Sequence, residues 1–483
     1  MNVLHPETHS RRAFLRRAGQ LALAGTAAPF ALNLAAIGEA AAFSATDYKA
    51  LVCVYLTGGN DHANTVVSYD SASHARYSAI RAPARSPHPL GLTRAALAAT
   101  VLRPTQPLPG GLQYALHPAM GELAALFNAG RAAVQLNVGP LAQPLTKAQY
   151  LSSDRTRHPI PPKLFSHNDQ QSVWQSGEPE GAAAGWGGAM GDLALAANGQ
   201  SLFTCISAAG GGVFVSGRSA LAYQISTEGA VQMEAARRPV YGSGAVSAAL
   251  AELVQQTRSH ELERAYTSVT TRALNAEARV NEGLAGAAMA TAFPAGNSLA
   301  DQLRIVARLI AARAALGVKR QVFLVSLPGF DLHDGLMIHH GGLLEKLSGA
   351  MAAFHRATQD LGLGQQVTAF TASDFGRTLV GNGDGTDHGW GSHHLMVGGA
   401  VRGAAFYGTP PPVSVGETSA PEDQWHVGQG RLLPTTSVDQ YAATLARWFG
   451  VSDTELSTVL PRVGLFGAGA GQPGYPVNLG FMG

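Results

Sequence analysis

Short, nearly continuous apolar runs recur along the chain and alternate with longer segments of helical periodicity. Apolar runs of this length are typical of strands that are buried on both faces of a parallel sheet. The runs that we interpret as strands span 49–56, 132–138, 203–207, 321–327 and 367–371. Helices are predicted over 118–128, 146–152, 247–283, 299–316, 339–361 and 437–449. This alternation predicts one α/β domain with a mostly parallel central sheet.

Two segments show no clear periodicity of hydrophobic residues. Residues 70–115 are rich in arginine, proline and alanine, and we expect a long surface excursion there with one helix near 94–100. Residues 209–245 combine glycines with short apolar runs, which indicates hairpins or loops on one edge of the sheet.

The first 42 residues have the pattern of an export signal. Arg11 and Arg12 stand before an apolar stretch over 21–37, and the small residues of 40–42 follow. A basic start, an apolar segment and a small-residue cleavage site define a secretory signal, and paired arginines make it the twin-arginine kind. A membrane anchor is the alternative, but the stretch is alanine-rich and only mildly hydrophobic. We therefore expect a twin-arginine signal peptide over 1–42 and a single mature domain over 43–483.

This signal also predicts a partner and a destination. The partner is the twin-arginine export machinery, which carries folded proteins, and the destination is the periplasm or the medium. No later run of 18 or more apolar residues occurs, so we expect no membrane span in the mature chain.

The net charge of the mature chain argues against nucleic acid as a partner. The chain has 34 basic and 32 acidic residues, and loss of four arginines and two glutamates with the signal leaves 30 of each. A mature net charge near zero gives no basic footprint for nucleic acid. Charged residues make up only 14% of the chain and glycines number 57, which indicates a large, loop-rich globular body.

Cys53 and Cys205 both lie in apolar, strand-like runs. An oxidising destination would permit a disulfide between them, but two buried, unpaired thiols are the favoured state. Two cysteines cannot build a cysteine-rich zinc or iron–sulfur site.

Carboxylates and imidazoles follow several of the predicted strands. Asp61 comes after the first run, Asp331 and His333 after the fourth, and Asp374 after the fifth. Because ligands of open α/β sheets bind beyond the carboxyl ends of the strands, we expect these groups to share one site. Oxygen and nitrogen ligands without thiolates suit Zn²⁺, Mn²⁺, Mg²⁺ or Ca²⁺. The loop beyond the fifth run adds the candidate ligands Asp387, His388, His393 and His394.

Each candidate also has a purely structural interpretation. Asp61 could be a turn residue or a helix cap, and Asp331 with His333 could form another turn. Asp374 could cap a turn or pair with Arg377. Missing motifs argue against a serine hydrolase, an NTPase, a dinucleotide enzyme and a zincin: the chain has no Gly-x-Ser-x-Gly elbow, no Walker A sequence, no strand-linked Gly-x-Gly-x-x-Gly and no His-Glu-x-x-His.

A set of short motifs occurs in order along the chain. Together with the paired arginines, this set resembles the domain of unknown function 1501 family of exported bacterial proteins, and the resemblance covers nearly all of the mature chain. The motifs are Leu56-Thr57-Gly58-Gly59-Asn60-Asp61, Leu116-His117-Pro118-Ala119-Met120, Asn137-Val138-Gly139, Ser166-His167, Gly329-Phe330-Asp331-Leu332-His333, Ser373-Asp374-Phe375-Gly376-Arg377-Thr378 and Thr386-Asp387-His388-Gly389-Trp390-Gly391.

That family looks like a branch of the alkaline phosphatase and sulfatase superfamily. The resemblance implies a three-layer α/β/α sandwich with a mostly parallel central sheet and a site at the carboxyl edge of that sheet. It also implies one or two divalent metal ions and a nucleophile at a helix start. The implied function is metal-dependent hydrolysis of a small phosphate or sulfate ester.

Carried over residue by residue, Asp61 resembles the aspartate after the first strand. Asp331 and His333 resemble an Asp/His ligand pair, and Asp374 resembles the aspartate of a second pair. His388 resembles the late histidine of the superfamily, and the alternatives for that role are His393 and His394.

Thr146 opens a helix after the second strand and is the candidate nucleophile, with a water on the metal as the alternative. One position departs from the resemblance, because Phe375 stands where active members commonly carry histidine, and phenylalanine cannot bind a metal. One metal site could therefore be lost. The competing hypothesis is a non-catalytic exported protein that keeps the fold for binding or assembly.

Overall fold

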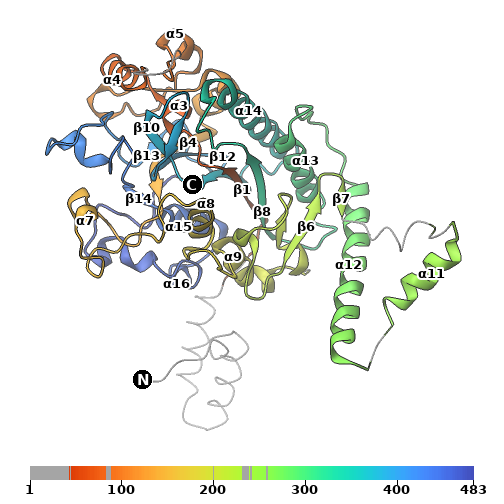
Figure 1. Cartoon of the computed structure of the whole chain (residues 1–483). Helices are drawn as coiled ribbons and strands as arrows, with labels where there is room; N and C mark the ends of the chain where they lie inside the picture. The colour runs from red at the N-terminus through yellow and green to blue at the C-terminus, as the bar shows by residue number, and fades with distance from the viewer. Residues whose placement is uncertain are drawn as a thin grey trace.

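A ten-stranded mixed sheet runs through the middle of the protein in the computed structural model (Figure 1). The structure describes residue 43 and residues 45–82, 89–199, 201–230, 239, 242–256 and 259–483, so the predicted signal peptide over 1–42 lies outside the described residues. The strand order is β13-β4-β12-β9-β1-β8-β5-β6-β7, with β14 paired to β4. The strands are β1 (Lys49–Thr57), β4 (Ala132–Gly139), β5 (Cys205–Ser207), β6 (Ala222–Ser226), β7 (Gly229–Ala230), β8 (Arg320–Pro328), β9 (Val367–Ser373), β12 (Ser392–Gly398), β13 (Phe406–Tyr407) and β14 (Thr436–Ser437).

The sheet is mostly parallel. β1 pairs in parallel with both β8 and β9, and β5 continues in the same direction beside β8. Two strands run the other way: β12 is antiparallel to β9 and β4, and β7 is antiparallel to β6. The carboxyl ends of β1, β8 and β9 therefore meet at one edge of the sheet.

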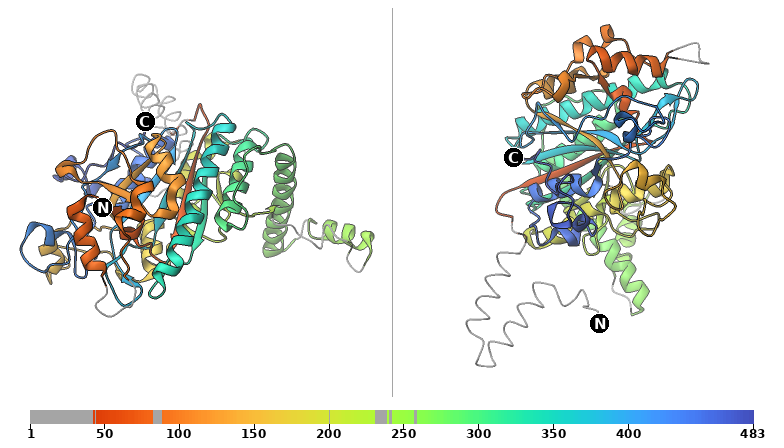
Figure 2. Two further views of the ribbon diagram at one scale, coloured as in Figure 1. Left: turned by 90° about the horizontal axis from the view of Figure 1, so that it is seen from above. Right: turned by 90° about the vertical axis from the view of Figure 1, so that its left-hand side faces the viewer.

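Helices cover both faces of the sheet and form the outer two layers. The helices are α3 (His62–Thr65), α4 (Ser71–Arg81), α5 (Arg94–Leu97), α6 (Gly121–Asn128), α7 (Lys147–Leu151), α8 (His167–Ser176), α9 (Trp186–Ala194), α11 (Gly244–Leu253), α12 (Glu261–Ala285), α13 (Ser298–Ala311), α14 (Leu336–Asp360), α15 (Val438–Phe449) and α16 (Leu456–Val459). Two views at right angles show α12 standing at the β7 edge, with α11 beyond it (Figure 2).

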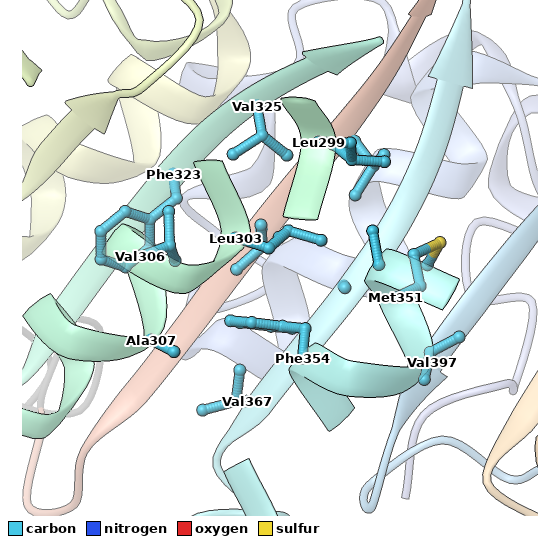
Figure 3. Close-up of a cluster of buried hydrophobic side chains, with 14 of the residues drawn as sticks. Leu299, Leu303, Val306, Ala307, Phe323, Val325, Met351, Phe354, Val367 and Val397 are labelled. Atoms are coloured by element: carbon cyan, nitrogen blue, oxygen red, sulfur yellow. The ribbon is translucent and has the colours of Figure 1, made fainter. Parts of the chain in front are cut away.

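The side chains of β1 point alternately to the two faces of the sheet, which explains why helices cover both faces. Val52 and Val54 belong to the apolar cluster that contains α6, α13 and α14, whereas Leu51 and Cys53 belong to the cluster that contains α9 and α15. Successive side chains of a strand point to opposite faces, so a continuous apolar run needs a cover on each side. The close-up of the first cluster shows side chains of α13 and α14 packed against β8 and β9 (Figure 3). The predicted three-layer α/β/α architecture with a mostly parallel sheet is confirmed.

Most predicted elements are present, and a few were missed. Helix α4 was not predicted because its three buried residues, His74, Tyr77 and Arg81, are mostly polar and hide its amphipathic pattern. The helical segment predicted over 247–283 is two helices, α11 and α12. The loop beyond β9 contains a hairpin, β10 (Arg377–Gly381) and β11 (Thr386–His388). A separate antiparallel pair joins β2 (Val66–Ser68) to β3 (Tyr114–Leu116), with α4 and α5 between the two strands in the sequence.

Both thiols are buried and unpaired, as favoured from the sequence. Burial raises the pKa of Cys53, and burial together with the charge of Asp192 raises that of Cys205 to about 12, so neither is a reactive thiolate. Among the helices that the structure describes, none combines the length and apolarity that crossing a bilayer requires.

Candidate metal centre

A group of histidines and one carboxylate lies at the carboxyl edge of the sheet. Asp331 follows the end of β8, and Asp374 follows β9 directly. His388 is the last residue of β11, and His167 is the first residue of α8. Ligand atoms of His167, Asp331 and His388 all lie within 4.8 Å of one another.

The Asp331 carboxylate is the point on which the group converges. The Nε2 atom of His167 is 3.3 Å from Oδ2 of Asp331. On the other oxygen, Nε2 of His333 lies at 3.1 Å and Nε2 of His388 at 3.2 Å. Three imidazole nitrogens of the same type therefore face one carboxylate.

Nδ1, the other nitrogen of each ring, faces an oxygen atom that can only accept a hydrogen bond. Nδ1 of His167 donates to Oδ2 of Asp374 at 2.7 Å, and Nδ1 of His388 donates to the Phe165 carbonyl at 2.7 Å. Nδ1 of His333 lies 3.3 Å from Oδ1 of Asp387. Carboxylates and carbonyls accept hydrogen bonds, so these contacts favour a proton on Nδ1, and a neutral ring of that tautomer has its lone pair on Nε2. A metal-binding histidine is commonly oriented in this way.

One contact between two rings tests whether the group suits a cation. Nε2 of His333 lies 2.9 Å from Nε2 of His388. Two neutral rings with their protons on Nδ1 would place two lone pairs against each other at this distance, so a proton or a cation must lie between them. Burial lowers the pKa of His388, which disfavours its doubly protonated form, so either a neutral ring with its proton on Nε2 or a bound cation relieves the contact. Imidazole nitrogens with one carboxylate are the usual donor set of a zinc site, so the residues fit a divalent ion.

A buried arginine holds Asp331 in its charged form. The Arg377 side chain is fully buried and donates to Oδ1 of Asp331 at 2.8 Å and to the Gly58 carbonyl at 3.3 Å. Burial acts to raise the pKa of Asp331, but the hydrogen bond and charge of Arg377 lower it overall. The carboxylate is therefore ionised, as a metal ligand must be.

Asp374 lies behind His167 and is completely buried. Its Oδ2 accepts from the Gly58 backbone N–H at 3.1 Å and from Nε2 of Gln171 at 3.0 Å, in addition to His167. The hydrogen bond to Asp374 raises the pKa of His167. Asp374 was predicted as a ligand, but the structure connects it to the group through His167 and gives it the position of an orienting carboxylate.

Phe375 forms one wall of the group. Its ring centre is 4.5 Å from that of His388 and 4.9 Å from that of His167. Gly59 lies against this ring in a left-handed conformation (φ 82°), and a Cβ atom there would approach the ring to 2.4 Å. At Gly58 (φ 116°) a Cβ atom would lie 2.4 Å from the Asp331 backbone nitrogen. The two glycines thus permit β1 to end against the histidine group.

The predicted ligand Asp61 lies in a different environment. Its carboxylate accepts from both terminal nitrogens of Arg81, at 2.6 and 2.9 Å, and caps α3 through Ala63. Both charged side chains are buried, and although burial opposes it, the Arg81 charge lowers the pKa of Asp61. Among the described residues, no hydrogen bond or ion pair connects Asp61 to Asp331. Its two oxygens are occupied by Arg81, which corrects the prediction that it completes the metal site.

Two histidines of β12 are also placed away from the group. His393 is buried, accepts a hydrogen bond from the Asn137 backbone at 3.1 Å and packs edge-on against His62 at 5.1 Å. His394 packs against Trp174, 4.8 Å between ring centres. A period of two along β12 sends these neighbours to opposite faces of the sheet, whereas His388 belongs to the hairpin outside it.

Thr146 is a helix cap. Its hydroxyl accepts from the Gln149 backbone at 3.3 Å, and the Gln149 side chain accepts from the Thr146 backbone at 2.8 Å, which completes a capping box at α7. Thr146 lines a hollow with Trp425 and Pro434. No described contact joins it to the histidine group.

Sequence reasoning missed His167 as a ligand. The residue appeared only within a two-residue motif, and no strand end precedes it, so the sole available signal was a histidine at the start of a helix. Arg431 was also missed: its Nε donates to the His388 carbonyl at 2.7 Å, and its guanidinium lies 5.4 Å over the Phe165 ring.

Comparison with known proteins places the chain in a family. A family model described as "Protein of unknown function (DUF1501)" matches residues 48–461. No curated protein matches the sequence.

Similar solved structures are distant. The lipoteichoic acid synthase LtaP from Listeria monocytogenes is 9% identical with a TM-score of 0.33, over 85% of this chain and 74% of that one. The protein Ps i-CgsB, solved in complex with k-i-k-neocarrahexaose, is 9% identical with a TM-score of 0.35, over 86% and 74%. A Bacteroides thetaiotaomicron protein from work on glycosaminoglycan metabolism is 10% identical with a TM-score of 0.33, over 84% and 74%.

Proposed function

The chain belongs to the DUF1501 family of proteins of unknown function, and we propose that it is a divalent-metal-dependent hydrolase of small phosphate or sulfate esters. The observation that carries this proposal is the convergence of three Nε2 atoms on Asp331, each from a ring whose Nδ1 faces an acceptor. A divalent cation among these atoms would be coordinated by the Nε2 lone pairs and would balance the negative charge of Asp331.

The residues that would hold the ion are His167, Asp331 and His388, with His333 next to them as a fourth candidate. Three nitrogens and one oxygen favour Zn²⁺, and Mn²⁺ is the nearest alternative. When bound, a divalent ion in this position would supply Lewis-acid polarisation of an ester oxygen and positive charge for the transition state.

The surrounding side chains would prepare this site for an anionic ester. Arg377 keeps Asp331 ionised and in place, and Asp374 keeps the His167 ring turned towards Asp331. Phe375 excludes water from one side of the two rings. Arg431 lies beside His388 and places a positive charge at the rim, where it would attract the phosphate or sulfate group.

We propose one ion rather than two. The second position of a two-metal centre would need Asp61 and a histidine in place of Phe375, but Asp61 is neutralised by Arg81. Because Thr146 caps α7 away from the histidine group, a water molecule is the attacking group in this proposal.

Export is part of the proposal. The paired arginines and apolar stretch before residue 43 support recognition by the twin-arginine machinery, which would deliver a folded protein to the periplasm or the medium. Cell fractionation of the full-length protein and of an Arg11→Lys/Arg12→Lys variant tests this. Retention of the variant inside the cell, with the wild type outside it, is the expected result.

A non-catalytic protein with a structural ion is the second candidate. Phe375 at the histidine position and the remote placement of Thr146 favour it, since each removes a group that hydrolysis in the superfamily uses. The two candidates share the ion and differ in turnover.

Metal analysis and turnover together test the proposal. Mature protein is purified without added metal, its metal content is measured, and hydrolysis of aryl phosphates and aryl sulfates is assayed. Asp331→Ala and His388→Ala should lose both the ion and the activity, whereas Asp334→Ala, an exposed neighbour outside the group, should keep both. Wild-type protein that is metal-free, stable and inert towards both ester types contradicts the proposal. Bound metal without turnover identifies the structural-ion candidate.

A further inference from the structure

A hollow of about 700 Å³ lies between α12 and the short 3₁₀ turn Ser201–Phe203 that precedes β5. This hollow is called the α12 groove below. Its lining is polar and basic on the helix side. Three arginines and three uncharged polar residues of α12 line it: Arg264, Arg272, Arg279, Thr267, Thr271 and Asn275.

The three arginines form a row along one side of α12. They are separated by eight and seven residues, which is close to two helical turns in each case. At a rise of 1.5 Å per residue, the row spans roughly 22 Å, with steps of about 12 and 10 Å. All three side chains are exposed, and within the described part of the chain none of them has an ion pair with an acidic side chain. Three unpaired positive charges therefore face the same groove.

The row is held by a helix that is anchored at one end. Val280 and Leu284, near the carboxyl end of α12, are buried in the main apolar cluster. The opposite wall is also fixed, because Phe203 is buried and its carbonyl accepts from the Gln321 side chain at 3.1 Å. The groove thus has two fixed walls, and the three arginines are carried on the helix that forms one of them.

The α12 groove is remote from the metal centre. Its turn precedes β5, which runs parallel to β8, so the groove belongs to the amino ends of these strands. Asp331 follows the carboxyl end of β8. Cys205 is paired with Val322, and nine residues of extended chain from Val322 to Asp331 would cover roughly 30 Å. The groove is therefore a separate site.

We propose that the α12 groove binds a linear polymer that carries sulfate or phosphate groups. Guanidinium groups bind such oxyanions through paired, charge-assisted hydrogen bonds, and the hydroxyl and amide groups of Thr267, Thr271 and Asn275 supply further hydrogen bonds. The row is too long for one inorganic anion, and it matches anionic groups spaced at about 10–12 Å along a chain. Because the net charge of the whole chain is only +2, this attraction is local to the groove.

The lining argues against single-stranded nucleic acid as the ligand. Proteins that bind single strands stack bases on exposed aromatic side chains. The aromatic residue in the described lining is Phe203, and it is 1% exposed. A polymer recognised through its anionic groups alone fits the groove better.

Binding of dextran sulfate and of long-chain polyphosphate to the mature protein tests the proposal, with neutral dextran of the same length as the reference polymer. Wild-type protein should bind the charged polymers, with affinity falling as salt is raised. Arg264→Gln/Arg272→Gln/Arg279→Gln should bind them at least tenfold more weakly. The matched control is Arg76→Gln/Arg103→Gln/Arg218→Gln, which removes three exposed arginines elsewhere and should bind like the wild type.

Circular dichroism of each variant checks that the helices remain folded. No binding by the wild type, equal binding to neutral dextran, or equal losses in both triple variants would overturn the proposal. Asp331→Ala should leave polymer binding unchanged, so the result is independent of the proposed hydrolase.

Discussion

The Nε2 atoms of His333 and His388 lie 2.9 Å apart, while both rings turn Nδ1 towards an acceptor. Fifty-five residues separate the two histidines in the sequence, yet their Nε2 atoms meet beside Asp331. Either a proton or a bound cation must lie between these two nitrogen atoms, and this alternative yields the first test.

A His333→Ala/His388→Ala variant should lose the bound ion. The expected consequence is a metal content close to zero and a lower Tm than metal-loaded wild type, because an ion that binds only the folded state stabilises it by about 2.7 kcal/mol at one hundred times its Kd. A chelator should lower the Tm of the wild type and leave that of the variant unchanged. If a shared proton and no ion relieves the contact, the chelator will have no effect on either protein.

Asp374→Asn should lower the affinity for the metal ion without removing a ligand. The amide can present a donor where His167 needs an acceptor, so the ring can turn and Nε2 leaves its position near Asp331. Substitution of such orienting partners commonly lowers metal affinity by roughly 10- to 100-fold. Competition against a chelating dye measures this loss of affinity. Gln171→Ala, which removes a second contact to the same carboxylate, is the matched control and should have a smaller effect.

A substitution at Asp61 distinguishes its predicted role as a metal ligand from its observed role in an ion pair with Arg81. Asp61→Ala leaves the Arg81 charge buried and alone, and breaking a buried pair in this way costs about 3–5 kcal/mol of folding free energy. Metal content of the folded fraction should stay at the wild-type level, since no described contact links Asp61 to the group. Urea unfolding and metal analysis of the same sample decide the matter. Lost metal with little lost stability would restore Asp61 as a ligand.

Thr146→Ala should leave turnover unchanged. The substitution removes the capping-box hydroxyl, and a lost cap of this kind costs about 1 kcal/mol. Steady-state hydrolysis of an aryl ester and thermal unfolding test the two parts. A large fall in kcat with the fold intact would make Thr146 the nucleophile after all.

Folding stability should fall as the pH is lowered from 7 to about 4. Burial lowers the pKa of His62 to about 4 and that of His340 to about 4, against about 6.5 in an unfolded chain. The unfolded state therefore binds more protons in this window, so the stability is complete above pH 6.5 and is lost as the pH falls towards 4, by up to roughly 3 kcal/mol for each histidine.

Urea unfolding at pH 8 and at pH 5 measures this loss. Asp61 does not add to it, because its lowered pKa places its own loss at more acidic pH. His340→Gln, which can keep a hydrogen bond to Asn60, should show a smaller loss than the wild type. Equal stability of the wild type at the two pH values would contradict the assignment.

Much of the framework was determined by the sequence alone. The apolar runs of β1, β4, β8 and β9 identify buried strands, because a strand that is covered on both faces needs apolar side chains at successive positions. This pattern is local and can be recognised without the rest of the chain. The capping box at Ser437 and the helix after it are equally local. Asp331 and His388 were predicted in one site because each follows a strand or its loop at a common edge.

The membership of the site was decided by tertiary structure. His167 is 207 residues from Asp374, and its role depends on α8 starting where β9 ends, which no local pattern states. Asp61 has the position of a ligand in the sequence, but the fold of α4 places Arg81 on both its oxygens. The physical reason is the same in both cases. Propensity and periodicity act over a few residues, whereas the charge that a carboxylate or imidazole meets is set by whichever distant segment packs against it.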